Sequence, residues 1–191
     1  LACRSVVRND GSAGVDNMGV TQLIGFIDTH RIDIVSKILK GDYIPNAIKG
    51  VEILKKNGKV RLLGVPTVVD RWLQQSVSRQ LMTRFELDFE PYSFGFRPKK
   101  NIQQAVIQSL AYINDGYQDI VDIDLKGFFD EVEHYKLLQL IYDRVKCETT
   151  LRLIRKWLQA PILVDGKLKR RRKGVPQDEG MHPKGRGLID L

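Results

Sequence analysis

Val121-Asp122-Ile123-Asp124-Leu125-Lys126-Gly127-Phe128-Phe129-Asp130 alternates apolar and acidic residues before it reaches a pair of phenylalanines. Side chains on a strand alternate between its two faces, so Asp122 and Asp124 share one face and the apolar residues take the other. We expect a short buried strand here, with Val121, Ile123 and Leu125 packed into a core. Two carboxylates at the end of an apolar strand suit a hard cation such as Mg²⁺, which takes oxygen ligands.

The net charge of +8 is the second informative property of this chain of 191 residues. Hydrophobic residues make up 42% of it, which is sufficient for one domain or two small ones with a real core. A basic excess of this size indicates a polyanionic partner, nucleic acid before an anionic membrane surface. A basic domain that is merely soluble is the alternative.

The cysteines and the apolar runs indicate the compartment. Cys3 and Cys147 are too few and too far apart for a disulfide framework or a zinc site, and no apolar run is long enough to span a bilayer. We therefore expect a protein of a reducing cytoplasm, with no membrane partner. Because the chain begins at Leu1 within sequence that already resembles a folded domain, we interpret it as a fragment or a trimmed piece.

Residues 51–63 are typical of a β-hairpin, because two apolar runs flank the turn signal Asn57-Gly58. The predicted tip carries three lysines, and an arginine follows on the returning strand: Lys55, Lys56, Lys59 and Arg61. These cations suit a finger that grips phosphates. They equally suit a charged edge that prevents strands of other molecules from pairing.

A second group of cations lies in the aromatic loop 91–100, at Arg97, Lys99 and Lys100. Aromatic rings beside cations can stack on bases while the cations hold phosphates. We favour the other interpretation for Tyr92 and Phe94, in which they anchor the loop to the core. A third group follows a predicted hairpin at 162–168: six of the seven residues at 167–173 are basic, among them Lys169, Arg170, Arg171 and Arg172.

Helical periodicity fills much of the remaining chain. We predict two helical pieces within 21–39, broken near Thr29-His30, and further helices at 70–85, 102–113, 133–145 and 149–159. Asn101 is the expected N-cap of the helix at 102–113, whose apolar residues define one face. Asp130 and Glu133 have the spacing of a capping box for the helix that follows. A lone histidine in that helix, His134, is expected to be structural.

Several motifs occur in an order and spacing that together resemble the reverse transcriptases encoded by group II introns, a retron-type family. The resemblance covers roughly residues 9–177, and its motifs are residues 9–16, 43–71, 93–98, 121–130 and 174–177. It implies an α+β fold: reverse-transcriptase-like fingers and an incomplete palm of the right-hand polymerase type, with helices packed on a small antiparallel sheet and a protruding β-hairpin. We expect a fingers-like subdomain with an N-terminal extension at 1–116, a partial palm at 117–177 and a divergent, flexible tail at 178–191.

The resemblance also implies roles for individual residues in RNA-directed DNA synthesis. Asp124 is the metal-binding catalytic aspartate, and Leu125 lends its backbone carbonyl to the same Mg²⁺. Phe129, five positions later, is the steric gate that selects dNTPs. Lys59 and Arg61 hold the triphosphate, and Gln177 contacts the sugar side of the incoming nucleotide. The cations of 55–61, 97–100 and 169–172 bind template or intron RNA, and primer DNA is the further partner in the complete enzyme. Asp122 has no assigned role.

After Gln177 the sequence departs from the family pattern, and the Tyr-x-Asp-Asp motif that supplies the remaining catalytic aspartates is absent. We therefore expect no polymerase activity, and doubtful Mg²⁺ binding, from this chain by itself. Two alternatives remain: an RNA-binding module without catalysis, or a decayed remnant. Unpaired palm edges would favour a homodimer. The resemblance implies a cytoplasmic location, in a bacterium or an organelle.

Overall fold

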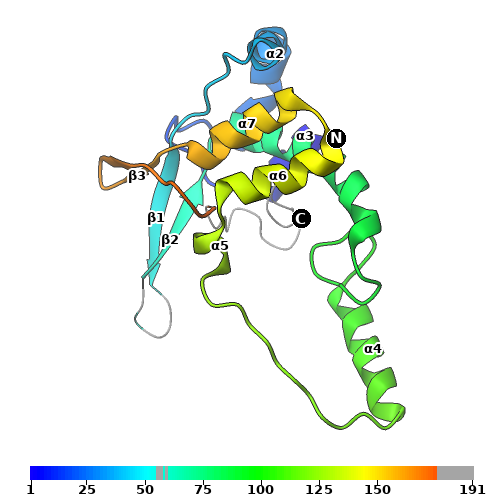
Figure 1. Ribbon diagram of the computed structural model, residues 1–191. Coiled ribbons are helices and arrows are strands. Elements are labelled where there is room, and N and C mark those ends of the chain that lie inside the picture. The colour runs from blue at the N-terminus through cyan, green and yellow to red at the C-terminus, as the bar shows by residue number, and fades with distance from the viewer. Residues whose placement is uncertain (55–57, 59, 176–191) are drawn as a thin grey trace.

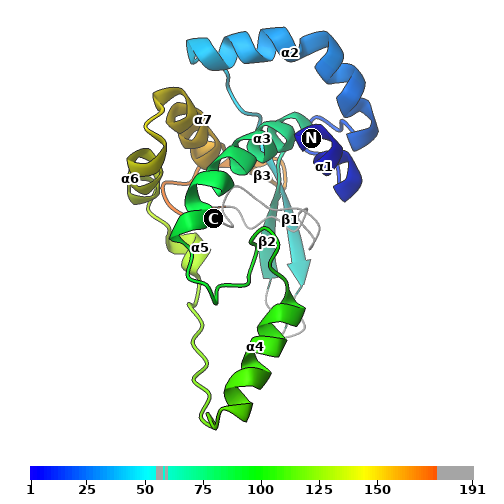
Figure 2. The ribbon, with the colours of Figure 1, turned by 90° about the vertical axis from the view of Figure 1, so that its right-hand side faces the viewer.

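The computed structural model describes residues 1–54, 58 and 60–175, with only the backbone of Arg61. Helices and one small sheet form a body, and a helix and an extended segment hang from it as an arm (Figures 1 and 2). We define the arm as residues 102–127. Four predicted site residues and the predicted tail lie outside the described residues: Lys55, Lys56, Lys59, the predicted nucleotide contact Gln177, and 178–191.

Four strands form the sheet of the body, in the order β2-β1-β3-β4. β1 (Ile48–Leu54) and β2 (Val60–Val65) pair antiparallel, with Leu54 opposite Val60, so the predicted hairpin is confirmed. β3 (Ile162–Val164) and β4 (Lys167–Lys169) form the second predicted hairpin. The sheet is mixed rather than antiparallel, because β1 and β3 run parallel. That parallel pair joins two segments that lie far apart in the chain.

The helix α3 (Val68–Phe85) is the central element of the body and follows β2 directly. It begins two residues before the predicted start, because the hydroxyl of Thr67 caps it by accepting a hydrogen bond from the backbone N–H of Asp70. α1 (Ala2–Asn9) packs against α3 with Val6, which is buried with Val68 in a small apolar cluster. The loop between α1 and α2 passes so close to α3 that a Cβ on Gly14 would lie 2.7 Å from the Cα of Thr67.

The remaining helices of the body are α2 (Leu23–Lys40), α6 (His134–Val145) and α7 (Glu148–Gln159). The predicted break at Thr29-His30 is wrong, because α2 is one continuous helix that ends at a left-handed Gly41. Thr29 does not interrupt it because its hydroxyl donates back to the carbonyl of Gly25. These helices and α3 share one core, whose buried residues include Ile34, Leu73, Leu81, Leu138, Ile154 and Trp157.

A buried carboxylate, that of Asp70, ties three of these elements together. It accepts hydrogen bonds from Tyr43 Oη at 2.8 Å, from Trp157 Nε1 at 3.1 Å and from the backbone N–H of Asn46 at 3.2 Å. The Thr67 hydroxyl donates to it as well, at 2.8 Å. Burial raises the pKa of Asp70 above its ordinary value, although these hydrogen bonds act in the opposite direction. α3, α7 and the approach to β1 are thereby fixed around one acid.

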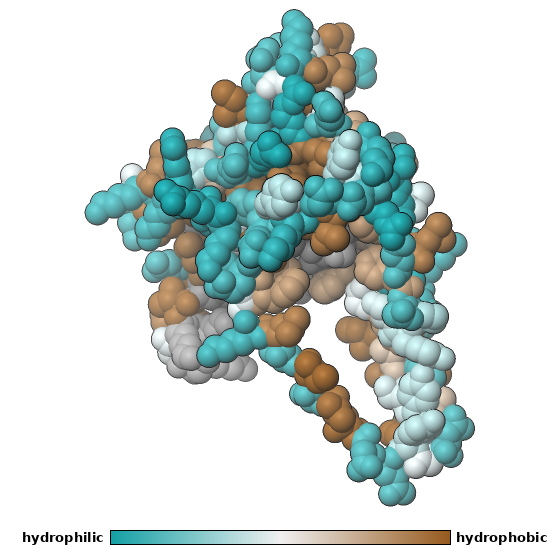
Figure 3. All heavy atoms as spheres, viewed as in Figure 1, coloured by the Kyte–Doolittle hydropathy of each residue, from teal (hydrophilic) through white to brown (hydrophobic). Residues whose placement is uncertain are grey.

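The arm differs from the body in packing. α4 (Ile102–Asn114) begins at Asn101 as predicted, with a capping box between Asn101 and Gln104. Its predicted apolar face, however, is open: Ile102, Val106, Leu110 and Ile113 are all exposed. Residues 115–127 then return to the body as an extended segment, along which hydrophobic side chains lie bare on the surface (Figure 3).

The predicted strand at 121–125 is therefore wrong for this structure. Val121 and Ile123 are each 81% exposed, and Leu125 is exposed too, so these residues reach no core. A strand satisfies its backbone N–H and C=O groups through a neighbouring strand. In the part of the chain that the structure describes, the four strands pair only with one another, and none runs beside 121–125.

Along the same described residues, none of the helices combines the length and the apolar character that crossing a bilayer requires.

Candidate nucleic-acid and nucleotide interface

Two of the predicted motifs meet where α5 (Phe128–Glu131) lies beside residues 174–175. The N–H of Val175 donates to the carbonyl of Phe129 at 2.8 Å, and the N–H of Gly174 donates to the carbonyl of Val132 at 2.8 Å. We call this contact the seam. It places the predicted gate Phe129 next to the segment that leads to Gln177.

The sequence around the seam explains why it forms. Gly174 has φ +78°, and a Cβ there would lie 2.7 Å from the carbonyl oxygen of Asp130, so glycine alone fits. His134, buried at the start of α6, is hydrogen-bonded through Nε2 to the carbonyl of Gly174 at 2.8 Å. This buried hydrogen bond agrees with the structural role predicted for His134. The predicted cap at Asp130 is wrong, because α6 begins after Glu133 and Asp130 lies within α5.

Phe129 itself is half-buried and packs against the main core, while its neighbour Phe128 is exposed. The two rings meet edge to face, with centroids 5.6 Å apart. One ring thus anchors α5 in the body while the other faces solvent beside it.

The predicted metal ligands lie apart from the seam, on the arm. Asp124 and Leu125 are exposed on the extended segment, and within the described residues Asp124 has no hydrogen-bond partner. A carboxylate and a backbone carbonyl are the donor types that Mg²⁺ takes. Yet the described residues contain no group of three or more acidic, histidine or cysteine side chains that could hold a metal ion. The donor chemistry fits Mg²⁺, but these residues do not assemble its coordination shell.

The cationic run after β3 reaches the seam at its end. Lys173 Nζ pairs with Glu131 Oε2 at 2.6 Å. Arg171 is half-buried near Asp130, and among the described residues its Nε and Nη2 have no hydrogen-bond partner. Burial lowers the pKa of Arg171, while the charge of Asp130 acts to raise it. The ion pair of Lys173 thereby ties the end of this run to α5.

The other predicted cations of this run remain open to solvent. Lys169, at the end of β4, is exposed, as are Arg170 and Arg172. Because β4 is the edge of the sheet farthest from β2, these side chains form a cationic border on the body. An exposed border of this kind can neutralise phosphates without further rearrangement.

In the loop 91–100, the prediction that Arg97 binds RNA is corrected by its burial. Arg97 is only 7% exposed, and its guanidinium donates to Glu86 Oε1 at 3.0 Å and to the carbonyls of Glu90 and Ser93 at 2.6 and 3.0 Å. It organises the loop and is not available to RNA. A loop with several unpaired carbonyls needs an internal donor, and a guanidinium with its five N–H groups supplies one.

The two lysines of that loop differ from each other. Lys100 donates to the carbonyl of Pro91 at 3.0 Å and lies over the ring of Phe94, which is half-buried as an anchor would be. Lys99 is exposed. The anchoring expected of Tyr92 is wrong, because its ring is exposed and meets Tyr112 of the arm edge to face.

The Asp70 cluster was not predicted from the sequence. Asp70 looked like an ordinary first-turn residue of a helix, and its partners Tyr43 and Trp157 lie 27 and 87 positions away. The one available signal was an acid in the first turn beside a threonine N-cap, which marks a helix start and not a buried site.

Comparison with known proteins adds independent findings. Residues 53–182 match the family described as reverse transcriptase (RNA-dependent DNA polymerase). The group II intron-encoded protein LtrA of Lactococcus lactis subsp. cremoris is 32% identical over 160 residues, 83% of this chain and 26% of that protein. Protein YkfC of Escherichia coli (strain K12) is 28% identical over 174 residues, 89% of this chain and 46% of that protein.

Among solved structures, a chain of a partial Cas6-RT-Cas1–Cas2 complex has a TM-score of 0.58 at 19% identity, over 99% of this chain and 31% of that one. At that identity the likeness concerns the fold. The chain spans about a quarter of LtrA and just under half of YkfC.

Proposed function

This chain belongs to the reverse transcriptase family, of the group II intron-encoded type, and we propose that it forms the part of such an enzyme that holds RNA and the incoming nucleotide. The predicted α+β fold of the fingers-and-palm type is confirmed. The whole enzyme would carry out RNA-directed DNA synthesis and act with its intron RNA in splicing and mobility. We retain residues 1–116 as its fingers-like part and 117–177 as the start of its palm.

The seam is the observation that carries this proposal. It holds Phe129 against residues 174–175, so the predicted gate and the predicted sugar contact Gln177, two residues beyond, would act on one nucleotide. Lys59 and Arg61 of the β1–β2 hairpin would neutralise its triphosphate. Phosphoryl transfer depends on such positioning and charge neutralisation more than on covalent chemistry.

In the complete enzyme Mg²⁺ would supply the charge that activates the primer hydroxyl and stabilises the leaving oxygens. Asp124 and the carbonyl of Leu125 are the residues of this chain that would hold it. Their position on an exposed segment suggests that residues 121–125 pair with a further strand before they can do so. We therefore propose that this chain alone does not extend a primer.

Primer extension tests that part of the proposal. The chain is incubated with an RNA template, a DNA primer, dNTPs and Mg²⁺, and the expected product level equals a protein-free blank. Extension well above the blank, abolished by Asp124→Ala and retained by the neighbouring Asp119→Ala, would contradict it.

RNA binding is the part of the function that needs no metal. The exposed cations Lys169, Arg170 and Arg172 are proposed to contact phosphates, together with Lys55, Lys56, Lys99 and, in a lesser role, Lys100. Binding of this kind weakens linearly in a plot of log affinity against log salt, with a slope of about −0.7 to −0.9 for each phosphate contact.

A charge-matched pair of variants tests the RNA-binding face. Replacing Lys169, Arg170 and Arg172 by glutamine should reduce the salt slope by about 2 to 3 units. Replacing the exposed cations Arg31, Lys40 and Arg155 of α2 and α7 removes the same charge and should change the slope by less than about 1 unit. Equal slopes in the two variants would refute a localised face.

The same titration separates the two alternatives. An RNA-binding module without catalysis would prefer a structured intron RNA over bulk RNA. A decayed remnant would bind all polyanions alike.

A further inference from the structure

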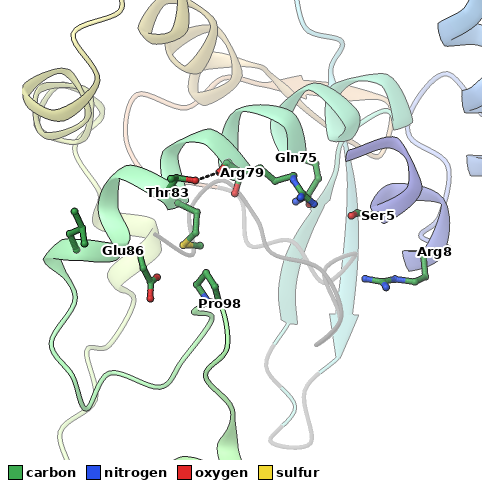
Figure 4. Close-up of a pocket in the computed structure, with 10 residues that line it drawn as sticks. Ser5, Arg8, Gln75, Arg79, Thr83, Glu86 and Pro98 are labelled. Atoms are coloured by element: carbon green, nitrogen blue, oxygen red, sulfur yellow. Dashed lines mark hydrogen bonds between the residues drawn. The ribbon is translucent and has the colours of Figure 1, made fainter. Parts of the chain in front are cut away.

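A pocket of 590 Å³ lies along α3 and is lined by residues of α1, α3, η2 (Glu86–Asp88) and the loop 91–100. Figure 4 shows Ser5 and Arg8 of α1 on one side, Glu86 and Pro98 on the other, and α3 above them. No residue of α5, β4 or 171–175 is among those that line it. Its size falls within the range of small-molecule sites.

One polar side chain stands out in this pocket. Gln75 is 8% exposed and lines the pocket, and among the described residues its amide has no hydrogen-bond partner. Its amide atoms are not among the buried atoms that lack a partner, so the donor and the acceptor are open to the pocket and available to a ligand that presents both. The edge of a nucleobase is such a ligand.

The charges around the opening favour an anion. Arg8 and Arg79 line the pocket from α1 and α3, both are exposed, and within the described chain neither guanidinium has an acidic partner. Glu86 is the acid of the lining, and Arg97 already neutralises it at 3.0 Å. A phosphate between the two arginines would gain charge-assisted hydrogen bonds.

Apolar side chains complete the lining. Met82 on α3, Leu87 on η2 and Pro98 of the loop contribute carbon and sulfur surface to the pocket. Thioether and aliphatic groups of this kind pack well against the face of an aromatic ring.

We propose that this pocket binds one nucleotide unit, with the base edge on the Gln75 amide, the base face against Met82, Leu87 and Pro98, and the phosphate between Arg8 and Arg79. The unit is either a free nucleotide or an unpaired nucleotide of a bound RNA strand. The proposal goes beyond the RNA-binding face at β4 and does not depend on it.

Titration of the four ribonucleoside 5′-monophosphates into ¹⁵N-labelled protein, followed by NMR, tests the proposal. We expect shifts concentrated on residues of α1 and α3 that line the pocket, with dissociation constants of about 0.1–10 mM. Arg79→Gln should weaken binding about tenfold, the effect of losing one charge-assisted contact. Arg8→Gln is the second charge variant, should Arg79→Gln fail to fold.

Matched controls separate recognition from general charge. Arg4→Gln removes an exposed arginine of α1 that does not line the pocket, and it should leave the affinity unchanged. Gln75→Met should reduce the preference among the four bases, while Gln80→Met, on the exposed side of α3, should not. The triple variant of Lys169, Arg170 and Arg172 should bind mononucleotides as the unmodified chain does, which distinguishes this site from the RNA-binding face.

A last comparison distinguishes a free nucleotide from a bound RNA strand. Uridine monophosphate and a ten-residue oligouridylate are compared: equal affinity assigns a free nucleotide, and a tighter oligonucleotide that Arg79→Gln weakens assigns a strand. The proposal is overturned if the pocket residues do not respond to any nucleotide, or if inorganic phosphate binds there as tightly as the nucleotides.

Discussion

The body and the arm of this protein use the same kinds of residues with opposite results. In the body, apolar side chains of α2, α3, α6 and α7 close one core around the Asp70 carboxylate. In the arm, α4 and residues 115–127 carry an equally apolar pattern that remains in solvent. A helix can form from its own caps and hydrogen bonds, whereas a strand needs a neighbouring strand. The arm therefore contains a capped helix, but its extended segment has no strand beside it.

The largest contrast is expected for the acids of the two regions. Asp70→Ala leaves the buried donors of Tyr43 and Trp157, and the backbone N–H of Asn46, without their acceptor, and should lower the free energy of unfolding by about 3–5 kcal/mol. Asp115→Ala, at the exposed end of α4, should cost less than about 0.5 kcal/mol. Urea unfolding measures both. Similar losses at the two positions would contradict the assignment of Asp70 as a buried hub.

Leucines give the next contrast. Leu81 is 1% exposed in the core, so Leu81→Ala should cost about 2–5 kcal/mol through lost burial and the cavity left behind. Leu110→Ala makes the same change on the open face of α4 and should alter the free energy of unfolding by less than about 0.5 kcal/mol. A loss of more than about 2 kcal/mol at Leu110 would mean that the face is covered in solution.

Glycines test the closeness of backbone packing. A Cβ at Gly14 meets the backbone of Thr67 at 2.7 Å, which cannot move aside as a flexible side chain would, so Gly14→Ala should cost about 1–3 kcal/mol. Gly95 has open space around it, and Gly95→Ala should be close to neutral. Thermal unfolding of the two variants compares them. A neutral Gly14→Ala would show that the loop before α2 is held less closely than the structure has it.

Substitutions on the open face of α4 should have the smallest effect on folding but a clear effect on association. We propose that the arm mediates self-association, because it carries both a bare apolar face and an unpaired extended segment. Replacing Val106, Leu110 and Ile113 by serine should leave thermal unfolding nearly unchanged and shift sedimentation toward monomer. If the unmodified chain is a monomer at every concentration, the proposed homodimer is wrong.

The accuracy of the sequence-based predictions follows the range of the interactions involved. The hairpin turn at Asn57-Gly58 and the Asn101 cap depend on neighbours a few residues away, and the strand pair and the helix that they predict are present. The strand at 121–125 depends on a distant partner, so its alternating pattern could not by itself place it in a sheet.

The candidate site shows the same division. Its motifs could be found and ordered from the sequence, and the seam brings two of them together. The burial of Arg97 could not be predicted, because it depends on three acceptors that the loop offers only once folded. The roles of Asp124, Leu125, Lys59, Arg61 and Gln177 stay predictions.

Hydrogen exchange of the protein with and without RNA, measured by mass spectrometry, is the most direct test of the proposed RNA-binding face. Without RNA we expect slow exchange in α3 and α7 and fast exchange along 118–127, since backbone N–H groups without partners exchange freely. With RNA we expect new protection in peptides from β4 to residue 175 and across the β1–β2 hairpin, and no change in α2. Protection that falls on α2 and α7 instead, or no protection at all, would contradict the proposal that this face holds RNA.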